Sequence, residues 1–177
     1  MSWQLPHGSS PKRLSDMLHN KYTRLAIVAG LVVLADQISK ALILTYLPLH
    51  HSIPVIAGIF DITHVLNPGG AFGLMADRSV VVRTIVFLFI SSMAVGLIFY
   101  FYHKTPLSHK FLATGFALIF GGAIGNLIDR VRFGTVVDFL DFYIGRHHWP
   151  AFNIADSAIT VGIFIFIYHL AFKKMPE

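Results

Sequence analysis

Four long apolar stretches alternate along the chain with shorter segments that hold most of the polar and turn-forming residues. They cover about residues 25–47, 80–102, 111–128 and 152–172. Each comes near or exceeds the roughly 20 residues that a helix needs to cross the hydrocarbon core of a bilayer. The first stretch is too long for the apolar region of a cleaved signal peptide. The pattern therefore predicts four transmembrane helices.

The connections between the predicted helices differ in character. Residues 48–79 contain short runs of β-branched and apolar residues separated by turn formers such as Pro54 and Pro68, which predicts a strand-and-turn element on the outer membrane surface. Residues 129–151 mix aromatic and charged side chains, as is typical of an interfacial stretch. Residues 103–110 are short enough to form a tight turn.

The predicted helical region forms one domain of about residues 21–174. Residues 1–20 are polar and contain two prolines, so we expect a flexible cytoplasmic tail there. The third stretch holds a set of glycines that would let another helix approach closely. These glycines are Gly115, Gly121, Gly122 and Gly125.

Composition supports a membrane protein and excludes several other classes. Of the 177 residues, 55% are hydrophobic and only 13% are charged, which is more apolar surface than a soluble domain of this size can bury. The net charge of +5 fits basic cytoplasmic loops, and we expect no nucleic-acid partner. The absence of cysteine excludes disulfides, thiolate metal sites, a cysteine nucleophile and a lipid-modified cysteine in this chain.

The basic residues predict the orientation in the membrane. If the four helices alternate in direction, eight of these residues fall on one side: Lys12, Arg13, Lys21, Arg24, Lys104, Lys110, Lys173 and Lys174. Because cytoplasmic loops carry the excess of lysine and arginine, we expect both termini in the cytoplasm. The connections at 48–79 and 129–151 then lie at the outer face.

Ionisable side chains inside a predicted span are costly and need an explanation. Asp36 and Lys40 are four residues apart on one face of the first helix. They form either an ion pair that fixes helix packing or part of an active site, and the residues alone favour the packing role without excluding the other.

Polar residues also converge at the outer ends of the last two helices. These are Asn126, Asp129, Arg130, Asp138, Asn153 and Asp156. Two carboxylates held close together in a low-dielectric site share a proton, so that one can activate water while the other acts as an acid. Asp138 and Asp156 suit such a pair. Asp129 with Arg130 is better interpreted as a supporting salt bridge.

The run Asn67-Pro-Gly69-Gly has two interpretations. It is a tight turn, or its flexible backbone comes close to a bound peptide while Asn67 donates hydrogen bonds to that peptide. Taken alone, the run does not decide between them.

Other functions are weaker but remain open at this level. Several histidines lie on the predicted outer side, yet none has the spacing of a metal motif, and we expect no metal or cofactor. A carrier or proton relay would need ionisable residues throughout the membrane, whereas the inner halves of the predicted helices lack them. A presenilin-like protease would show a Gly-x-Gly-Asp stretch, which is not found.

Taken together, five motifs resemble those of the lipoprotein signal peptidase (signal peptidase II) family of bacterial intramembrane aspartyl proteases. They occur in family order at 36–40, 67–72, 121–130, 136–139 and 152–157. The resemblance implies four transmembrane helices, a small extracytoplasmic β-element and an interfacial helical segment that caps the site.

The same resemblance implies a function and roles for individual residues. Asp138 and Asp156 would form the catalytic dyad, and the supporting or substrate-binding positions would be Asp36, Lys40, Asn67, Gly69, Asn126, Asp129, Arg130 and Asn153. The substrate would be a prolipoprotein whose cysteine carries diacylglycerol, cleaved just before that cysteine. We expect a monomer in the bacterial inner membrane, in contact with membrane lipids and with its active site at the outer face.

Overall fold

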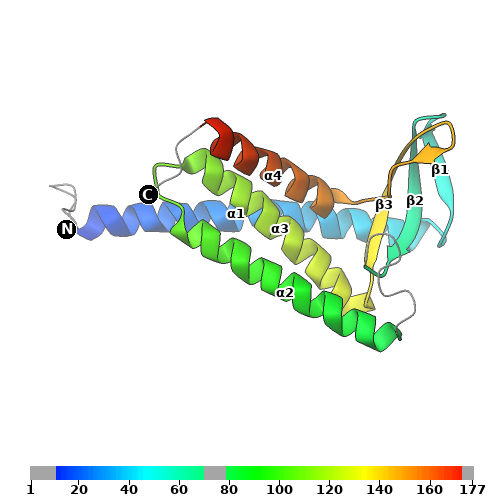
Figure 1. The fold of residues 1–177 in the computed structure, drawn as a ribbon, viewed down its shortest axis with the longest axis horizontal. Coiled ribbons are helices and arrows are strands. Elements are labelled where there is room, and N and C mark those ends of the chain that lie inside the picture. The colour runs from blue at the N-terminus through cyan, green and yellow to red at the C-terminus, as the bar shows by residue number, and fades with distance from the viewer. Residues whose placement is uncertain (1–10, 70–78, 173–177) are drawn as a thin grey trace.

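The computed structural model describes residues 11–69 and 79–172. Its elements in chain order are helix α1 (Pro11–Tyr46), strands β1 (Ser52–Ile56) and β2 (Phe60–Asn67), helices α2 (Val80–Lys104) and α3 (Lys110–Phe133), strands β3 (Val136–Ile144) and β4 (His147–His148), and helix α4 (Ile154–Phe172). Figure 1 shows an elongated helical bundle with the sheet at one end.

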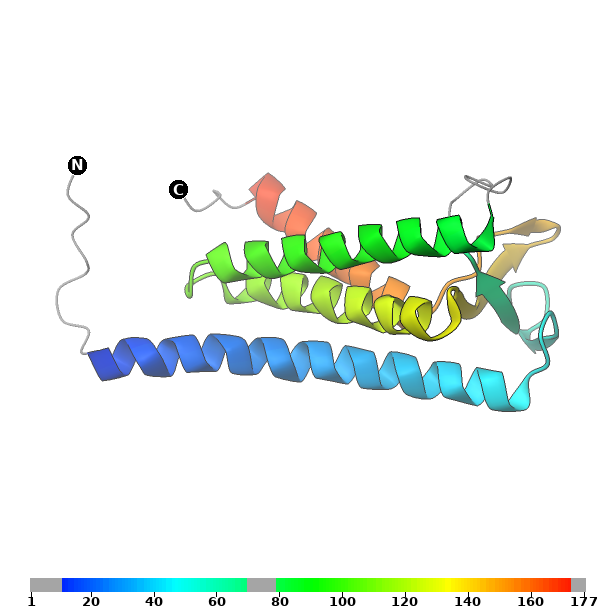
Figure 2. The same ribbon diagram turned by 90° about the horizontal axis from the view of Figure 1, so that it is seen from below.

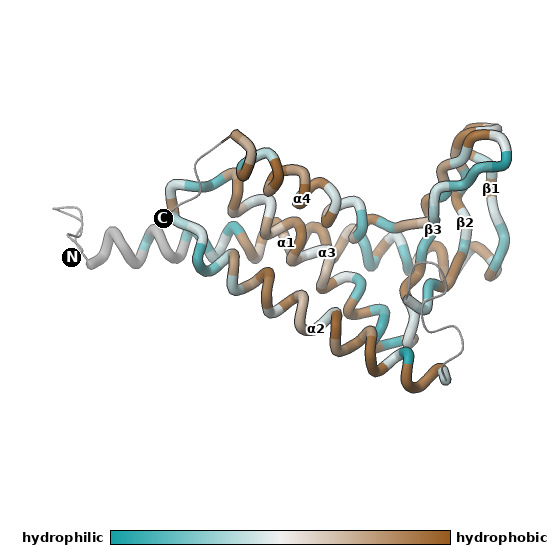
Figure 3. The backbone as a smooth tube through the Cα atoms, in the orientation of Figure 1, coloured by the Kyte–Doolittle hydropathy of each residue, from teal (hydrophilic) through white to brown (hydrophobic). Residues whose placement is uncertain are grey.

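All four helices contain a stretch that is long and apolar enough to cross a membrane. This confirms the four predicted spans. Figure 3 shows apolar residues along most of the length of the helices, with hydrophilic positions near the sheet and at the opposite end. Large apolar side chains such as Phe89 and Phe164 are exposed on the outside of the bundle, as expected for surfaces that face lipid.

Helix α1 begins much earlier than the predicted span. It has 36 residues, which corresponds to a length of about 54 Å. The prediction of a flexible tail is therefore wrong for residues 11–20, whereas residues 1–10 lie outside the described part of the chain. Pro11 has a backbone angle suited to the first helical turn. No further proline follows before residue 46, and extending a helix is easier than starting one.

Helix α3 lies at the centre of the bundle and contacts the other three helices. Figure 2 shows α3 between α1 and α2. The predicted small-residue face makes this position possible. A Cβ atom at Gly121 would lie 2.8 Å from Ala29 Cα, and one at Gly125 would lie 2.7 Å from Asp36 Oδ2. These glycines let the backbone of α3 approach α1 closely.

The four strands form an antiparallel arrangement in the order β1-β2-β3-β4. The strands in residues 48–69 confirm the predicted element. The sheet is larger than expected, because β3 and β4 come from residues 129–151, which were predicted only as an interfacial stretch. The run of valine, phenylalanine and tyrosine in β3 suits a strand. Pairing with β3 also satisfies an edge of β2 that would otherwise be exposed.

The connection from α3 to β3 is a short turn. Gly134 ends α3 with a φ of 73°, a left-handed conformation that favours glycine, and its N–H donates to Arg130 O. The turn directs the chain from the membrane helix into the sheet. The described segments on either side of the sheet end, residues 47–69 and 134–153, hold strands and turns, and residues 70–78 lie outside the described part of the chain.

Candidate active site

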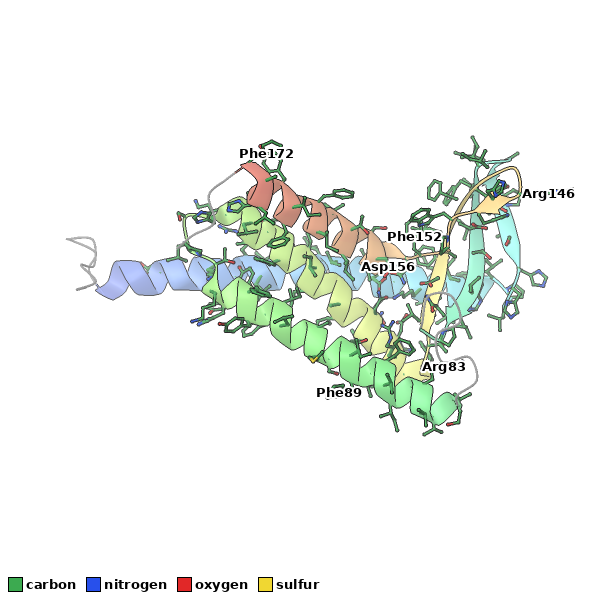
Figure 4. The ribbon with its side chains drawn as sticks, in the orientation of Figure 1. Arg83, Phe89, Arg146, Phe152, Asp156 and Phe172 are labelled. Carbon is green, nitrogen blue, oxygen red and sulfur yellow. The ribbon has the colours of Figure 1, made fainter. Side chains whose placement is uncertain are left out.

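The polar side chains predicted to converge do so where α3 and α4 meet β3. Asp138 lies on β3, Asn126 lies within α3, and Asp156 lies in the first turn of α4. Figure 4 shows Asp156 at the end of α4 that adjoins β3. Segments far apart in the sequence therefore contribute to one cluster at the sheet end of the bundle.

Asp138 is held by two amide side chains. Asn67 Nδ2 donates to Asp138 Oδ2 at 2.9 Å, and Asn153 Nδ2 donates to Asp138 Oδ1 at 2.7 Å. The carboxyl group is almost fully buried, with 2% of the residue exposed. Both oxygens therefore have a fixed orientation in a site with little access to water.

Asp156 is fixed by the start of its own helix. Asn153 Oδ1 accepts from the backbone N–H of Asp156 at 2.9 Å, and Asp156 Oδ2 accepts from the backbone N–H of Asn153 at 3.3 Å. This reciprocal pair is a capping box that satisfies two backbone donors at the helix start. Asn126 Nδ2 donates to the other oxygen, Asp156 Oδ1, at 2.7 Å.

Asn153 joins the two aspartates. Its Nδ2 donates to Asp138 and also to Asn126 Oδ1 at 3.1 Å, while its backbone N–H and Oδ1 bond to Asp156. Asn153 itself is fully buried. A single asparagine thus contacts both carboxyl groups of the predicted pair.

The environment of Asp138 favours its neutral form. The pKa of the Asp138 carboxyl is raised to about 7, mainly by burial and to a smaller extent by the nearby charge of Asp156, although the hydrogen bonds from Asn67 and Asn153 lower it. Both protonation states of Asp138 are therefore accessible near neutral pH.

A buried ion triad lies next to the aspartate pair and contacts it through Asn126. Lys40 Nζ is 2.9 Å from Asp36 Oδ2 and 2.9 Å from Asp129 Oδ2, and it donates to Asn126 Oδ1 at 3.0 Å. All three charged side chains are at most 2% exposed. Because Lys40 binds the oxygen of the Asn126 amide, the amide nitrogen is directed toward Asp156.

The two carboxylates of the triad each hold the residue before a candidate catalytic aspartate. Asp36 Oδ1 accepts from the backbone N–H of Ala155, and Asp129 Oδ2 accepts from the backbone N–H of Val137, both at 3.0 Å. The triad therefore connects α1 and α3 to the two backbone segments that carry Asp156 and Asp138. Asp36 and Lys40 combine the two roles left open by the sequence, since they fix packing and also position the site.

Arg130 does not form the predicted salt bridge with Asp129, and this prediction was wrong. The carboxylate of Asp129 pairs with Lys40, whereas Arg130 Nη1 donates to the backbone carbonyl of Asn126 at 3.3 Å. Neighbouring residues on a helix point about 100° apart, so an acid and a base in sequence cannot readily meet.

Gln37 is a site residue that the sequence reasoning missed. Its Nε2 lies 3.1 Å from Asp36 Oδ2, 3.0 Å from Asp129 Oδ1 and 3.2 Å from the backbone carbonyl of Gly125. Its position in an apolar span was the available signal, because a polar amide at membrane depth requires partners.

The turn after β2 approaches the same cluster. The Gly69 N–H donates to Asn67 Oδ1 at 2.9 Å, and the φ of 87° at Gly69 favours glycine. This bond orients the Asn67 amide so that its nitrogen donates to Asp138. Residues 70–72 of the motif lie outside the described residues.

Two histidines of the sheet contact groups other than the aspartate pair. His148 Nδ1 is 2.9 Å from Asp141 Oδ2, and the buried His64 Nδ1 is 2.8 Å from Leu47 O. Within residues 11–69 and 79–172, no three histidine or carboxylate side chains converge as a group able to hold a metal ion.

Comparisons with known proteins agree with this fold. Residues 28–172 match the family described as signal peptidase (SPase) II. The lipoprotein signal peptidase of Desulforapulum autotrophicum is 56% identical over 154 residues, which cover 87% of this chain and 95% of that protein. The lipoprotein signal peptidase of Geobacter sulfurreducens is 50% identical over 138 residues, which cover 78% of this chain and 84% of that protein.

A solved structure described as a bacterial membrane enzyme, determined by the in meso method at 1.9 Å resolution, has the same fold. It is 34% identical with a TM-score of 0.74, over 85% of this chain and 94% of that one. The chain is thus a membrane-embedded peptidase. It belongs to the signal peptidase II family, which confirms the resemblance noted in the sequence.

Proposed function

We propose that this chain is an aspartyl endopeptidase that removes the signal peptide from diacylglyceryl-modified prolipoproteins by cutting just before the lipidated cysteine. Its relatives are named lipoprotein signal peptidases, which supports the substrate class. The observation that carries the catalytic assignment is the contact of Asn153 with both Asp138 and Asp156. A buried and a half-buried carboxyl group, both held by one asparagine, suit shared-proton chemistry.

In the proposed reaction one carboxyl group is ionised and the other is protonated. The ionised group takes a proton from water while the water oxygen attacks the scissile carbonyl carbon, and the protonated group gives its proton to the carbonyl oxygen. The tetrahedral diol then collapses and the carbon–nitrogen bond breaks. The carboxyl group that took the proton of the water gives it to the leaving nitrogen, and the other carboxylate takes a proton from a diol hydroxyl, which restores both groups. The products are a signal peptide with a new carboxyl group and a lipidated cysteine with a free amine.

The supporting residues act on the geometry of this pair. Lys40 fixes the Asn126 amide, and Asp36 and Asp129 hold the backbone next to each aspartate. Asn67 holds Asp138 from the sheet side. This enzyme would act as a monomer and without a cofactor.

The proposed orientation places the aspartate pair at the outer face of the bacterial inner membrane, with both termini in the cytoplasm. The basic residues at the opposite end of the bundle support this orientation. A substrate anchored by its lipid can reach a site at the membrane interface by lateral diffusion.

A cleavage assay tests this function. Purified protein in detergent is incubated with a diacylglyceryl prolipoprotein, and the products are identified by mass spectrometry, with the unlipidated precursor as the control. We expect cleavage immediately before the modified cysteine of the lipidated substrate only, unchanged by EDTA. Equal cleavage of both precursors, or loss of cleavage with EDTA, would contradict the proposal.

A further inference from the structure

A second polar site lies at the end of the bundle opposite the aspartates. A cavity of about 460 Å³ opens there between the first part of α1 and the turn that joins α2 to α3. Figure 2 shows these segments at the end of the molecule far from the sheet. The cavity shares no residue with the aspartate cluster.

Three cations line this cavity. Lys21 and Arg24 are three residues apart on one face of α1, and Lys110 is the first residue of α3. Lys110 adds its charge to the positive end of the α3 dipole, where an anion is favoured. None of the lining residues is an aspartate or a glutamate.

Lys21 is buried without a carboxylate partner. Only 6% of the residue is exposed, and its Nζ donates to the backbone carbonyls of Thr105 at 2.6 Å and His103 at 2.9 Å. Ion pairs among the described residues join Lys40 to Asp36 and Asp129, and His148 to Asp141. The described structure therefore shows no ion pair for the three cavity cations, and one of them, Lys21, is buried, where a charge without a counter-charge is costly.

The position of Lys21 is firmly fixed. Tyr102 Oη donates to the Lys21 backbone carbonyl at 2.5 Å, and the Tyr22 hydroxyl lies 2.7 Å from His103 Nδ1. The buried Tyr102 belongs to the hydrophobic core between the helices. The buried cation of the cavity is thus held by a well-packed part of the bundle.

The remaining walls of the cavity are largely apolar. Ile27 and Val28 continue from the cations into the membrane-spanning part of α1, and Leu107 and Ala113 face them from the turn and from α3. A charged headgroup site that continues into an apolar wall suits a molecule with an anionic head and a hydrocarbon chain. Free phosphate would use only the charged part of the cavity.

We propose that this cavity binds one anionic glycerophospholipid. Its phosphate lies against Lys21, Arg24 and Lys110, and an acyl chain lies along Ile27 and Val28. The lipid compensates the buried charge and joins the start of α1 to the α2–α3 turn.

Lipid binding to the full-length protein in neutral detergent tests this proposal. Native mass spectrometry follows titration with phosphatidylglycerol, and phosphatidylcholine with the same acyl chains is the uncharged control. We expect one saturable phosphatidylglycerol, not displaced by millimolar inorganic phosphate or glycerol phosphate. Equal binding of both lipids would overturn the proposal, and displacement by inorganic phosphate would indicate a simple anion site instead.

Matched variants locate the site. Arg24→Gln and Lys110→Gln should each weaken phosphatidylglycerol binding about fivefold, since one cation near a membrane surface contributes about that factor. Lys104→Gln removes the same charge from the same end of the bundle, but Lys104 lies outside this cavity and over the Tyr100 ring, so binding should change less than twofold. An equal loss in Lys104→Gln would show general electrostatic attraction and overturn the proposal.

The two cavity variants carry single changes at half-buried or exposed positions, and thermal unfolding checks that each is folded. If one is unfolded, the other still decides the question. Lipid binding is measured without substrate, so its outcome is independent of the proposed peptidase reaction.

Discussion

Asp138 combines burial with hydrogen bonds that orient both of its oxygens. Burial raises the pKa of its carboxyl group to about 7, well above the value of about 4 in an unfolded chain. The folded protein therefore binds this proton more tightly than the unfolded chain does. Between about pH 4 and pH 7, the contribution of Asp138 to folding stability falls as pH rises.

This linkage predicts a pH-dependent difference between the wild type and Asp138→Asn. The melting temperature of the wild type should fall relative to that of the variant as pH increases from 5 to 8, because the asparagine does not ionise. Thermal unfolding in detergent at several pH values measures the difference. Parallel pH profiles for the two proteins would contradict the assignment of a raised pKa to Asp138.

The sequence identified most of the site residues but not all of their partners. Asp138, Asp156, Asn126 and Asn153 were brought together by helix direction and by the family motifs, and the structure joins them through hydrogen bonds. The partner of Asp129 was predicted wrongly, because the direction of a side chain around a helix decides which charges meet. Gln37 was missed although a polar amide within an apolar span requires partners.

Helix α3 is the element on which the packing depends. Its glycine face brings α1 close enough for Lys40 to reach both Asn126 and Asp129. The four spans were predictable from apolar length alone. Strand β3 was not predicted, because it forms by pairing with β2, which is distant in the sequence.

Enlarging one glycine of α3 should separate α3 from α1. In Gly121→Ala, the new methyl group would meet the Ala29 backbone, and we expect a loss of about 1–3 kcal/mol of stability. Gly96→Ala on α2 is the matched control, since a Cβ atom there meets nothing within 4 Å. Thermal unfolding compares the two variants, and equal melting temperatures would contradict the close packing.

The whole molecule has two chemically different ends. The aspartate pair and sheet lie at one end, and the cavity with Lys21, Arg24 and Lys110 lies at the other. The apolar spans and the distribution of basic residues predicted from the sequence that the two ends would differ in this way. The cavity itself was not predictable, because it depends on how α1 packs beside the α2–α3 turn.

Cysteine labelling tests the orientation of these ends, and the natural chain has no cysteine to give a background. Ser108 in the α2–α3 turn and Arg146 in the β3–β4 turn are both exposed. In spheroplasts, Arg146→Cys should react with a membrane-impermeant maleimide, and Ser108→Cys should react only after permeabilisation. The reverse pattern would contradict the proposed topology.

The most direct test of the account is the turnover of a diacylglyceryl prolipoprotein by Asp138→Asn and Asp156→Asn. The matched control is Asp141→Asn, which removes the same charge from strand β3 at a side chain that contacts His148 and not the aspartate pair. We expect each dyad variant to lose at least about a hundredfold in turnover while remaining folded, with Asp141→Asn close to wild type. Near-normal turnover by either folded dyad variant would contradict the catalytic pair.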